Sequence, residues 1–148
     1  MKGFLTSAIL VLGFIGLADA WYLASTALNG GVLTCDLGVL DGCNTVAQSP
    51  YSKLLGLPIA LYGVGYYAAV FALAGLLVFA PSRSVYKTLF ALSAFGALAS
   101  TYFMGLQLLV IQAACVYCVL SVVVAYLVFF ASAWLWKGHR HTKLVVLP

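Results

Sequence analysis

Long apolar runs separated by short polar segments dominate the chain. A helix needs about 20 apolar residues to cross the hydrocarbon core of a bilayer. Four runs reach that length, and we predict membrane-spanning helices over about 4–28, 56–80, 86–111 and 115–136. Strands are disfavoured because the period-two alternation of a membrane β-barrel is missing. The pattern predicts an all-α integral membrane protein, a four-transmembrane-helix bundle forming a single membrane domain over residues 1–148.

The first apolar run has a second interpretation, as a secretory signal peptide. It contains "LADA", which resembles a small-residue cleavage site. The run is longer than the roughly 7–15 apolar residues of such a signal. We therefore expect a helix that is retained.

Composition and charge placement support a membrane protein of defined orientation. Hydrophobic residues make up 65% of the chain and charged residues only 7%. The net charge of +4 does not indicate nucleic-acid binding, because the basic residues stand at the edges of the apolar runs. If the chain crosses four times, one side receives Lys2, Arg83, Lys87, Lys137, Arg140 and Lys143. By the positive-inside rule, both termini and a tail over 137–148 are cytoplasmic.

The opposite side receives a polar loop over 29–55, with Asp36, Asp41 and a single basic residue, Lys53. This loop is therefore expected to be extracytoplasmic, between the first and second spans. Disulfides persist in such a compartment.

All four cysteines are expected on that outer side. Cys35 and Cys43 lie in the loop, and "CVYC" places Cys115 and Cys118 on one turn where the last span begins. The amide groups and positive end of a helix stabilise a thiolate there. Because a thiolate attacks a disulfide sulfur, two pairs on one face form a relay for electrons.

Cysteines at these positions also fit other roles in principle. Structural zinc sites use two closely spaced pairs, whereas seven residues separate Cys35 from Cys43, so we expect no metal. Haem attachment needs a histidine directly after the second cysteine of the motif, and Val119 stands there. A static loop disulfide with inert thiols at Cys115 and Cys118 remains an alternative.

Three features together resemble the vitamin K epoxide reductase family, in particular its bacterial homologues. They are the cysteine pair in the first loop, the segment "CNTVAQSPYSKLLGLPIALYG" and the later "CVYC". The most specific are the order of the cysteines, the serine six residues after Cys43 and "GLPIALYG" at the start of the second span. The likeness extends from about Gly16 to Trp136.

The resemblance implies a thiol–disulfide oxidoreductase of the bacterial inner membrane, a quinone reductase and protein-thiol oxidase that supports disulfide formation. By position, a secreted or periplasmic thioredoxin-like partner would exchange with Cys35, and Cys43 would attack Cys115. Cys118 would then face a membrane quinone, and Ser49 would lie near the quinone carbonyl. Without a fused thioredoxin-like domain in this chain, we expect the partner to be a separate protein.

Two positions depart from the vertebrate members. Ile59 stands where those carry asparagine, and Val122 where they carry tyrosine, so polar groups are lost from the expected quinone pocket. We therefore expect ubiquinone or menaquinone rather than vitamin K epoxide as the acceptor. Asp19 is an acid inside the first span, with a role either on a proton path or in a hydrogen bond to Thr101 or Ser100.

Two other families of four-span membrane proteins share part of this pattern. Four-span adhesion or scaffold proteins of the claudin kind would use Cys35–Cys43 as a structural staple, but their tryptophan-rich signature before the loop cysteines is missing. "CVYC" would also have no role in such a protein. The other bacterial quinone-linked thiol oxidase family is four-helical too, but its closely spaced pair lies in the first outer loop, the reverse of the order here.

Overall fold

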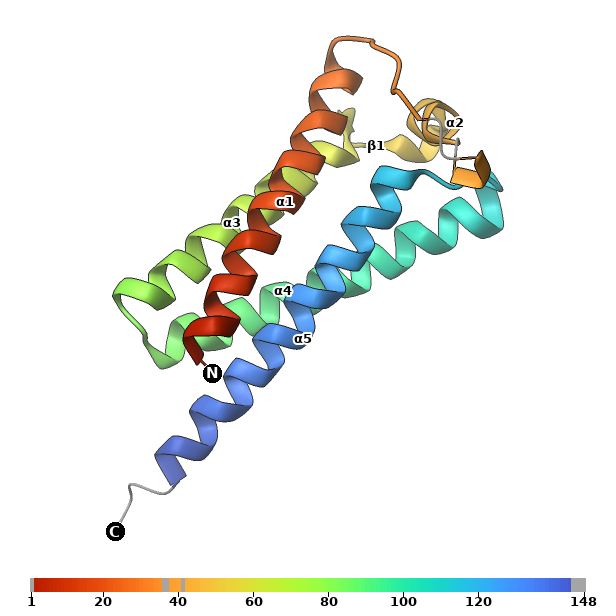
Figure 1. Ribbon diagram of the computed structural model, residues 1–148. Coiled ribbons are helices and arrows are strands. Elements are labelled where there is room, and N and C mark those ends of the chain that lie inside the picture. Colours follow the sequence, from red (N-terminus) through yellow and green to blue (C-terminus); the bar gives the residue numbers. More distant parts are fainter. Residues whose placement is uncertain (1, 36–37, 41, 145–148) are drawn as a thin grey trace.

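Four long helices dominate the computed structural model (Figure 1), which describes residues 2–35, 38–40 and 42–144. They are α1 (Lys2–Leu28), α3 (Ile59–Phe79), α4 (Arg83–Gly105) and α5 (Val116–Leu144). A π-helical segment, η3 (Leu106–Ile111), continues α4. Within the described residues, four helical spans are long and apolar enough to cross a membrane, which confirms the predicted bundle. Asp36 and Asp41, which were predicted to lie on the extracytoplasmic side, are outside the described residues.

The remaining elements are short and lie in the connection between α1 and α3. They are η1 (Gly38–Leu40), α2 (Cys43–Gln48), η2 (Pro50–Ser52), β1 (Lys53–Leu54) and β2 (Leu57–Pro58). The two strands pair antiparallel, and the residues joining them, Leu55 and Gly56, both have positive φ. This hairpin explains why α3 begins at Ile59 rather than near residue 56, as the apolar pattern predicted.

The last helix is longer than expected. Hydropathy placed its end near residue 136, whereas α5 continues to Leu144 through most of the expected tail. His139 stacks on Tyr86 with ring centroids 4.6 Å apart. This contact between α5 and α4 extends the helix packing beyond the apolar run.

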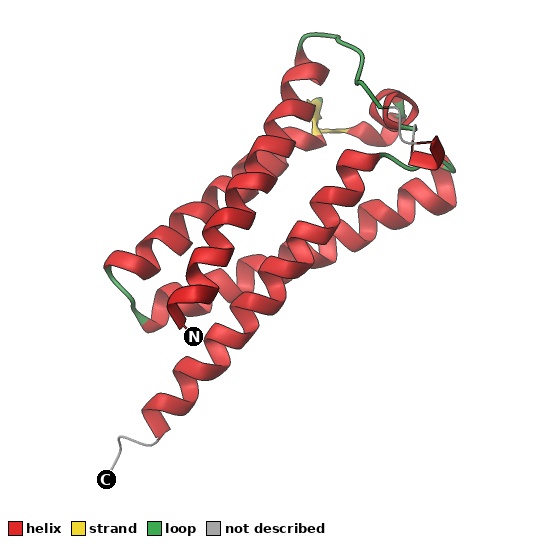
Figure 2. Cartoon of the chain, viewed as in Figure 1, coloured by secondary structure: helices red, strands yellow, loops and turns green. Residues whose placement is uncertain are grey.

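The long helices form a closed ring of neighbours. Helix α1 packs on α3 and α5, and α4 packs on α5 and α3. Figure 2 shows the start of α1 and the last turns of α5 near one end of the bundle and the connection between α1 and α3 at the other. The turn between η3 and α5 lies at that same second end, which we call the loop end (Figure 1).

Two glycines allow the helices to approach closely. A Cβ atom at Gly16 of α1 would overlap the ring of Tyr67, and one at Gly96 of α4 would overlap the ring of Tyr66. The Tyr67 hydroxyl donates a hydrogen bond to the Ser121 carbonyl at 2.8 Å, which ties α3 to α5. The two tyrosine rings of α3, packed on glycines of α1 and α4, together with the hydrogen bond to α5, therefore position these three helices around α3.

Candidate active site

The four cysteines gather at the loop end, although 71 residues separate Cys43 from Cys115 in sequence. Cys43 is 0% exposed and Cys115 only 1%, and both belong to one buried cluster with Leu33. Cys35 and Cys118 pack against the same cluster. The predicted meeting of the two pairs is thus present in the structure.

Cys35 and Cys43 form a disulfide with a Cα–Cα distance of 6.2 Å. Helix α2 begins at Cys43. The next residue, Asn44, forms hydrogen bonds with Leu33, which lies two residues before Cys35. The Leu33 N–H donates to the Asn44 side-chain oxygen at 2.8 Å, and the Asn44 amide donates to the Leu33 carbonyl at 3.0 Å. This clamp holds the loop cysteines together.

The loop lies directly on the chain that leads into α5. The Gly42 N–H donates to the Ala114 carbonyl at 3.0 Å, and a Cβ atom at Gly42 would lie 2.8 Å from the Ala113 Cβ. The Tyr117 hydroxyl donates to the Thr34 carbonyl at 2.9 Å. Contacts on both sides of the disulfide therefore fix the loop over Cys115.

Gln107 supports the second cysteine pair from η3. This side chain is 4% exposed, and its Oε1 accepts a hydrogen bond from the Cys115 N–H at 3.3 Å. A π-helical segment adds one residue to a turn and is frequent at functional sites. Sequence reasoning missed Gln107, although a glutamine inside an apolar span is the kind of residue that marks a functional position.

Cys115 and Cys118 are free thiols in different environments. Cys118 lies deeper along α5 but is half-buried, whereas Cys115 is covered because the loop packs on it. A hydrogen bond from the Cys118 thiol lowers the pKa of Cys115 to about 7, helped by the backbone N–H groups of Cys118 and Tyr117. Burial and the negative charge of Asp19 act in the opposite direction on this pKa. Cys115 is therefore the nucleophilic thiol of the pair near neutral pH.

A model of the vitamin K epoxide reductase family matches residues 7–133. The chain belongs to this family. A search of curated proteins found no match. Membership makes the protein an integral membrane oxidoreductase of a quinone-linked family, in agreement with its four spans and paired cysteines.

Three further positions were expected at the quinone from the likeness to the vitamin K epoxide reductase family. The Ser49 hydroxyl donates to the Val46 carbonyl at 2.8 Å, at the end of α2. Ile59 is the first residue of α3, and Val122 is half-buried on α5. Their roles stay predictions, because no cavity described in the structure brings the three together.

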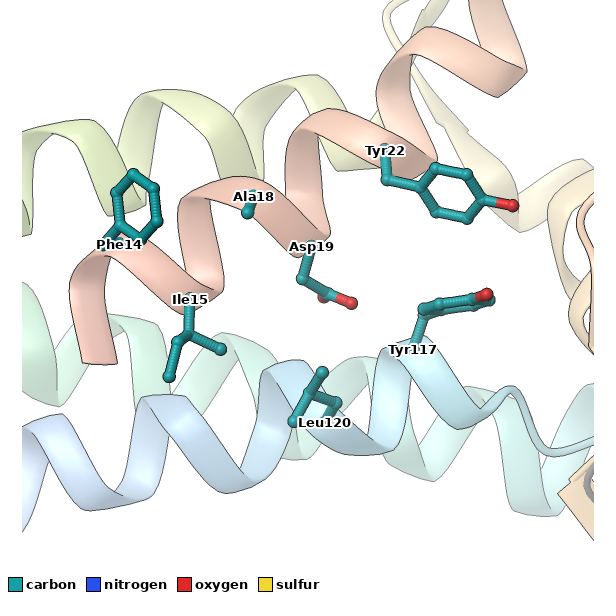
Figure 3. A pocket seen from close by; sticks show the side chains of 7 residues that line it. All are labelled: Phe14, Ile15, Ala18, Asp19, Tyr22, Tyr117 and Leu120. Atoms are coloured by element: carbon teal, nitrogen blue, oxygen red, sulfur yellow. The ribbon is translucent and has the colours of Figure 1, made fainter. Parts of the chain in front are cut away.

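Asp19 has no hydrogen-bond partner for either carboxyl oxygen among the described residues, although it is only 7% exposed. The expected bond to Thr101 or Ser100 is wrong. The Thr101 hydroxyl instead bonds the Ala97 carbonyl and the Tyr126 hydroxyl, between α4 and α5. Asp19 contributes to a cavity of about 390 Å³ between α1 and α5 (Figure 3).

We predict that the reactivity of Cys115 depends on the hydrogen bond from Cys118. A lowered pKa means that the Cys115 thiolate is present above pH about 7 and is lost as the pH falls through this value. In Cys118→Ala, burial remains without the hydrogen bond, so alkylation of Cys115 should begin at clearly higher pH. Cys118→Ser keeps a hydrogen-bond donor, so its pH midpoint for alkylation of Cys115 should stay close to that of the wild type. Mass spectrometry of iodoacetamide-treated protein measures the midpoint, and equal midpoints in both variants would contradict the assignment.

Proposed function

We propose that this protein is a quinone-linked thiol oxidase that reoxidises a secreted thioredoxin-like protein and so supports disulfide formation. The observation that carries the proposal is the burial of Cys43 and Cys115 in one cluster, with the closed loop disulfide docked over the free thiol pair. A static staple would not require the second cysteine pair beneath it.

In the first step, a partner thiolate attacks the sulfur of Cys35 in the Cys35–Cys43 disulfide. Cys35 is half-buried, whereas Cys43 is completely buried, so Cys35 is the sulfur that a protein can reach. The second partner thiol then displaces Cys35, which leaves an oxidised partner and a reduced loop pair.

In the second step, the Cys43 thiolate attacks a Cys115–Cys118 disulfide at Cys115, and Cys35 resolves the mixed disulfide. The loop bond closes again and the α5 pair becomes a dithiol. This is the redox state seen in the structure, with Cys35–Cys43 closed and Cys115 and Cys118 free. In the third step, the dithiol becomes a disulfide and the quinone takes up two electrons and two protons.

The orientation follows from the positive-inside rule. We propose that the loop end faces the extracytoplasmic side of a bacterial inner membrane, with both termini in the cytoplasm. The start of α1, the last turns of α5 and the turn between α3 and α4 lie at the end away from the loop (Figure 1), and Arg83 is the first residue of α4.

We further propose an acceptor of the ubiquinone or menaquinone class, with Ser49, Ile59 and Val122 on the side of the pocket that receives the ring. Support comes from the likeness to the family and from the apolar character of Ile59 and Val122. An apolar pocket suits a quinone ring better than a polar epoxide.

A reconstitution tests the function. Purified protein is given a reduced thioredoxin-like protein and a short-chain ubiquinone, and quinone absorbance is followed together with the partner's free thiols. One partner disulfide should form for each quinone reduced. A partner variant that keeps only its attacking cysteine should accumulate a mixed disulfide with Cys35, because the second partner thiol that would displace Cys35 is missing. If the wild type consumes no quinone, the proposal is wrong and a structural role for the loop disulfide gains support.

A further inference from the structure

Asp19 is a buried acid that the relay described above does not use. It lies on α1, inside a membrane-spanning helix, and both of its carboxyl oxygens lack hydrogen-bond partners among the described residues. An unpaired charge at this depth is costly, so the neutral, proton-carrying form is favoured. A residue that stores a proton without a structural bond is suited to giving that proton away.

The carboxyl group points into the cavity between α1 and α5 (Figure 3). Apart from Asp19, the lining is apolar except near the loop end, where Tyr22 and Tyr117 stand with ring centroids 5.1 Å apart. The Tyr117 hydroxyl bonds the carbonyl of Thr34 in the exposed loop. The cavity therefore leads from Asp19 past two tyrosine side chains toward the loop end.

Asp19 lies close to the thiol pair. Leu120, two residues beyond Cys118 on α5, lines the same cavity as Asp19. A negative charge on Asp19 acts electrostatically on both thiols of the pair, and also on Tyr117 of α5 and Tyr67 of α3. Together with Tyr22 of α1, these are the titratable groups that face it, and no cationic side chain lines the cavity.

The proton balance of the last step leaves a role for such an acid. Near pH 7 about half of Cys115 is thiolate, and in this reactive form the reduced pair holds two electrons to transfer but only one proton. Quinol formation needs two protons. The Cys118 thiol supplies one of them, and the other must come from a neighbouring group.

We propose that the Asp19 carboxyl gives the quinone its second proton and is reprotonated from water on the loop side, past Tyr22 and Tyr117. In this step the Cys115–Cys118 bond forms, two electrons pass to the quinone, and one proton each leaves Cys118 and Asp19. Net uptake of one proton from water replaces the one that Cys115 released on ionising. The inference rests on the proposed quinone reductase function and names the group that couples it to protons.

Steady-state kinetics of the reconstituted full-length protein test the proposal, with a small dithiol as donor and a short-chain ubiquinone as acceptor. Replacement of a general acid typically costs 10²-fold or more, so Asp19→Asn should lower kcat about 100-fold with KM unchanged. In the wild type kcat should fall at alkaline pH as Asp19 loses its proton, and this falling limb should vanish in Asp19→Asn. Asp19→Glu should restore part of kcat and also the fall of kcat at alkaline pH.

A matched control is Thr6→Val, which alters another buried polar residue of α1, whose hydroxyl donates to the Lys2 carbonyl. It should leave kcat and its pH profile unchanged. Reduction of the Cys115–Cys118 disulfide by the dithiol without quinone should proceed at the wild-type rate in Asp19→Asn, which shows that the fold is intact. Equal loss of this half-reaction, or a normal kcat with its alkaline limb, would overturn the role of Asp19. A wild type that reduces no quinone would overturn the proposed function as well.

Discussion

Replacement of Cys118 by alanine is expected to abolish quinone reduction, whichever thiol donor is supplied. Cys118 is the half-buried member of the free pair, and it donates the hydrogen bond that keeps Cys115 reactive. Without Cys118 the α5 disulfide cannot form, so two electrons cannot leave the pair together. The rate should fall by roughly 10⁴-fold or more, as it does when other enzymatic nucleophiles are removed.

The same variant should trap an intermediate. Without Cys118, the Cys115 thiolate can attack Cys43 of the loop disulfide and release the Cys35 thiol. No second thiol on α5 then resolves this bond, so a Cys43–Cys115 disulfide should accumulate and be detectable by peptide mass mapping. Val123→Ala serves as the control, because Val123 is an exposed residue of the same helix. Quinone reduction at the normal rate by Cys118→Ala would show that the redox assignment is wrong.

Replacement of Cys35 by alanine is expected to separate the two kinds of electron donor. A protein donor needs a sulfur at the surface of the loop, and Cys43 is completely buried between the loop and Cys115. Turnover with a reduced thioredoxin-like protein should therefore fall by about 10³-fold or more, since the sulfur that is attacked has been removed. A small dithiol can still reach the half-buried Cys118 and release Cys115, whose low pKa makes it a good leaving group.

Dithiol-driven turnover of Cys35→Ala should thus stay within a few-fold of the wild type, and this is measured by quinone absorbance with each donor in parallel. Thr45→Ala, at an exposed position on α2, should leave both activities unchanged. Loss of both activities in Cys35→Ala would mean that the loop disulfide is needed for the fold rather than for exchange with a partner.

The sequence predicted the architecture well but located boundaries less well. The four spans were found from their length, yet the turn at Leu55–Gly56 delays α3 and the packing of His139 on Tyr86 extends α5. Both differences arise from contacts that hydropathy does not register. Among site residues, the four cysteines were named in advance, whereas Gln107 and Asn44 were not. Their roles depend on which backbone groups come near their amides, and a linear pattern does not contain that information.

Asp19 shows the same division. Its place inside an apolar run marked it as unusual from the sequence, because lipid offers no partner to a carboxyl group. Only the packing of α1 against α5 showed that the expected hydroxyl partner at Thr101 is engaged elsewhere and that a cavity adjoins the acid.

By itself, then, the sequence determined that this is a four-span membrane protein and that its cysteines can be oxidised and reduced in pairs. Bilayer thickness demands apolar runs of a set length, and thiol chemistry demands close sulfur spacing, so both are visible in a linear pattern. The tertiary structure decided which groups meet. Cys43 and Cys115 share one buried cluster, Gln107 accepts a hydrogen bond from the Cys115 N–H, and Asp19 has no hydrogen-bond partner among the described residues and lies beside a cavity. These depend on contacts between segments far apart in the chain, which form only when the helices pack.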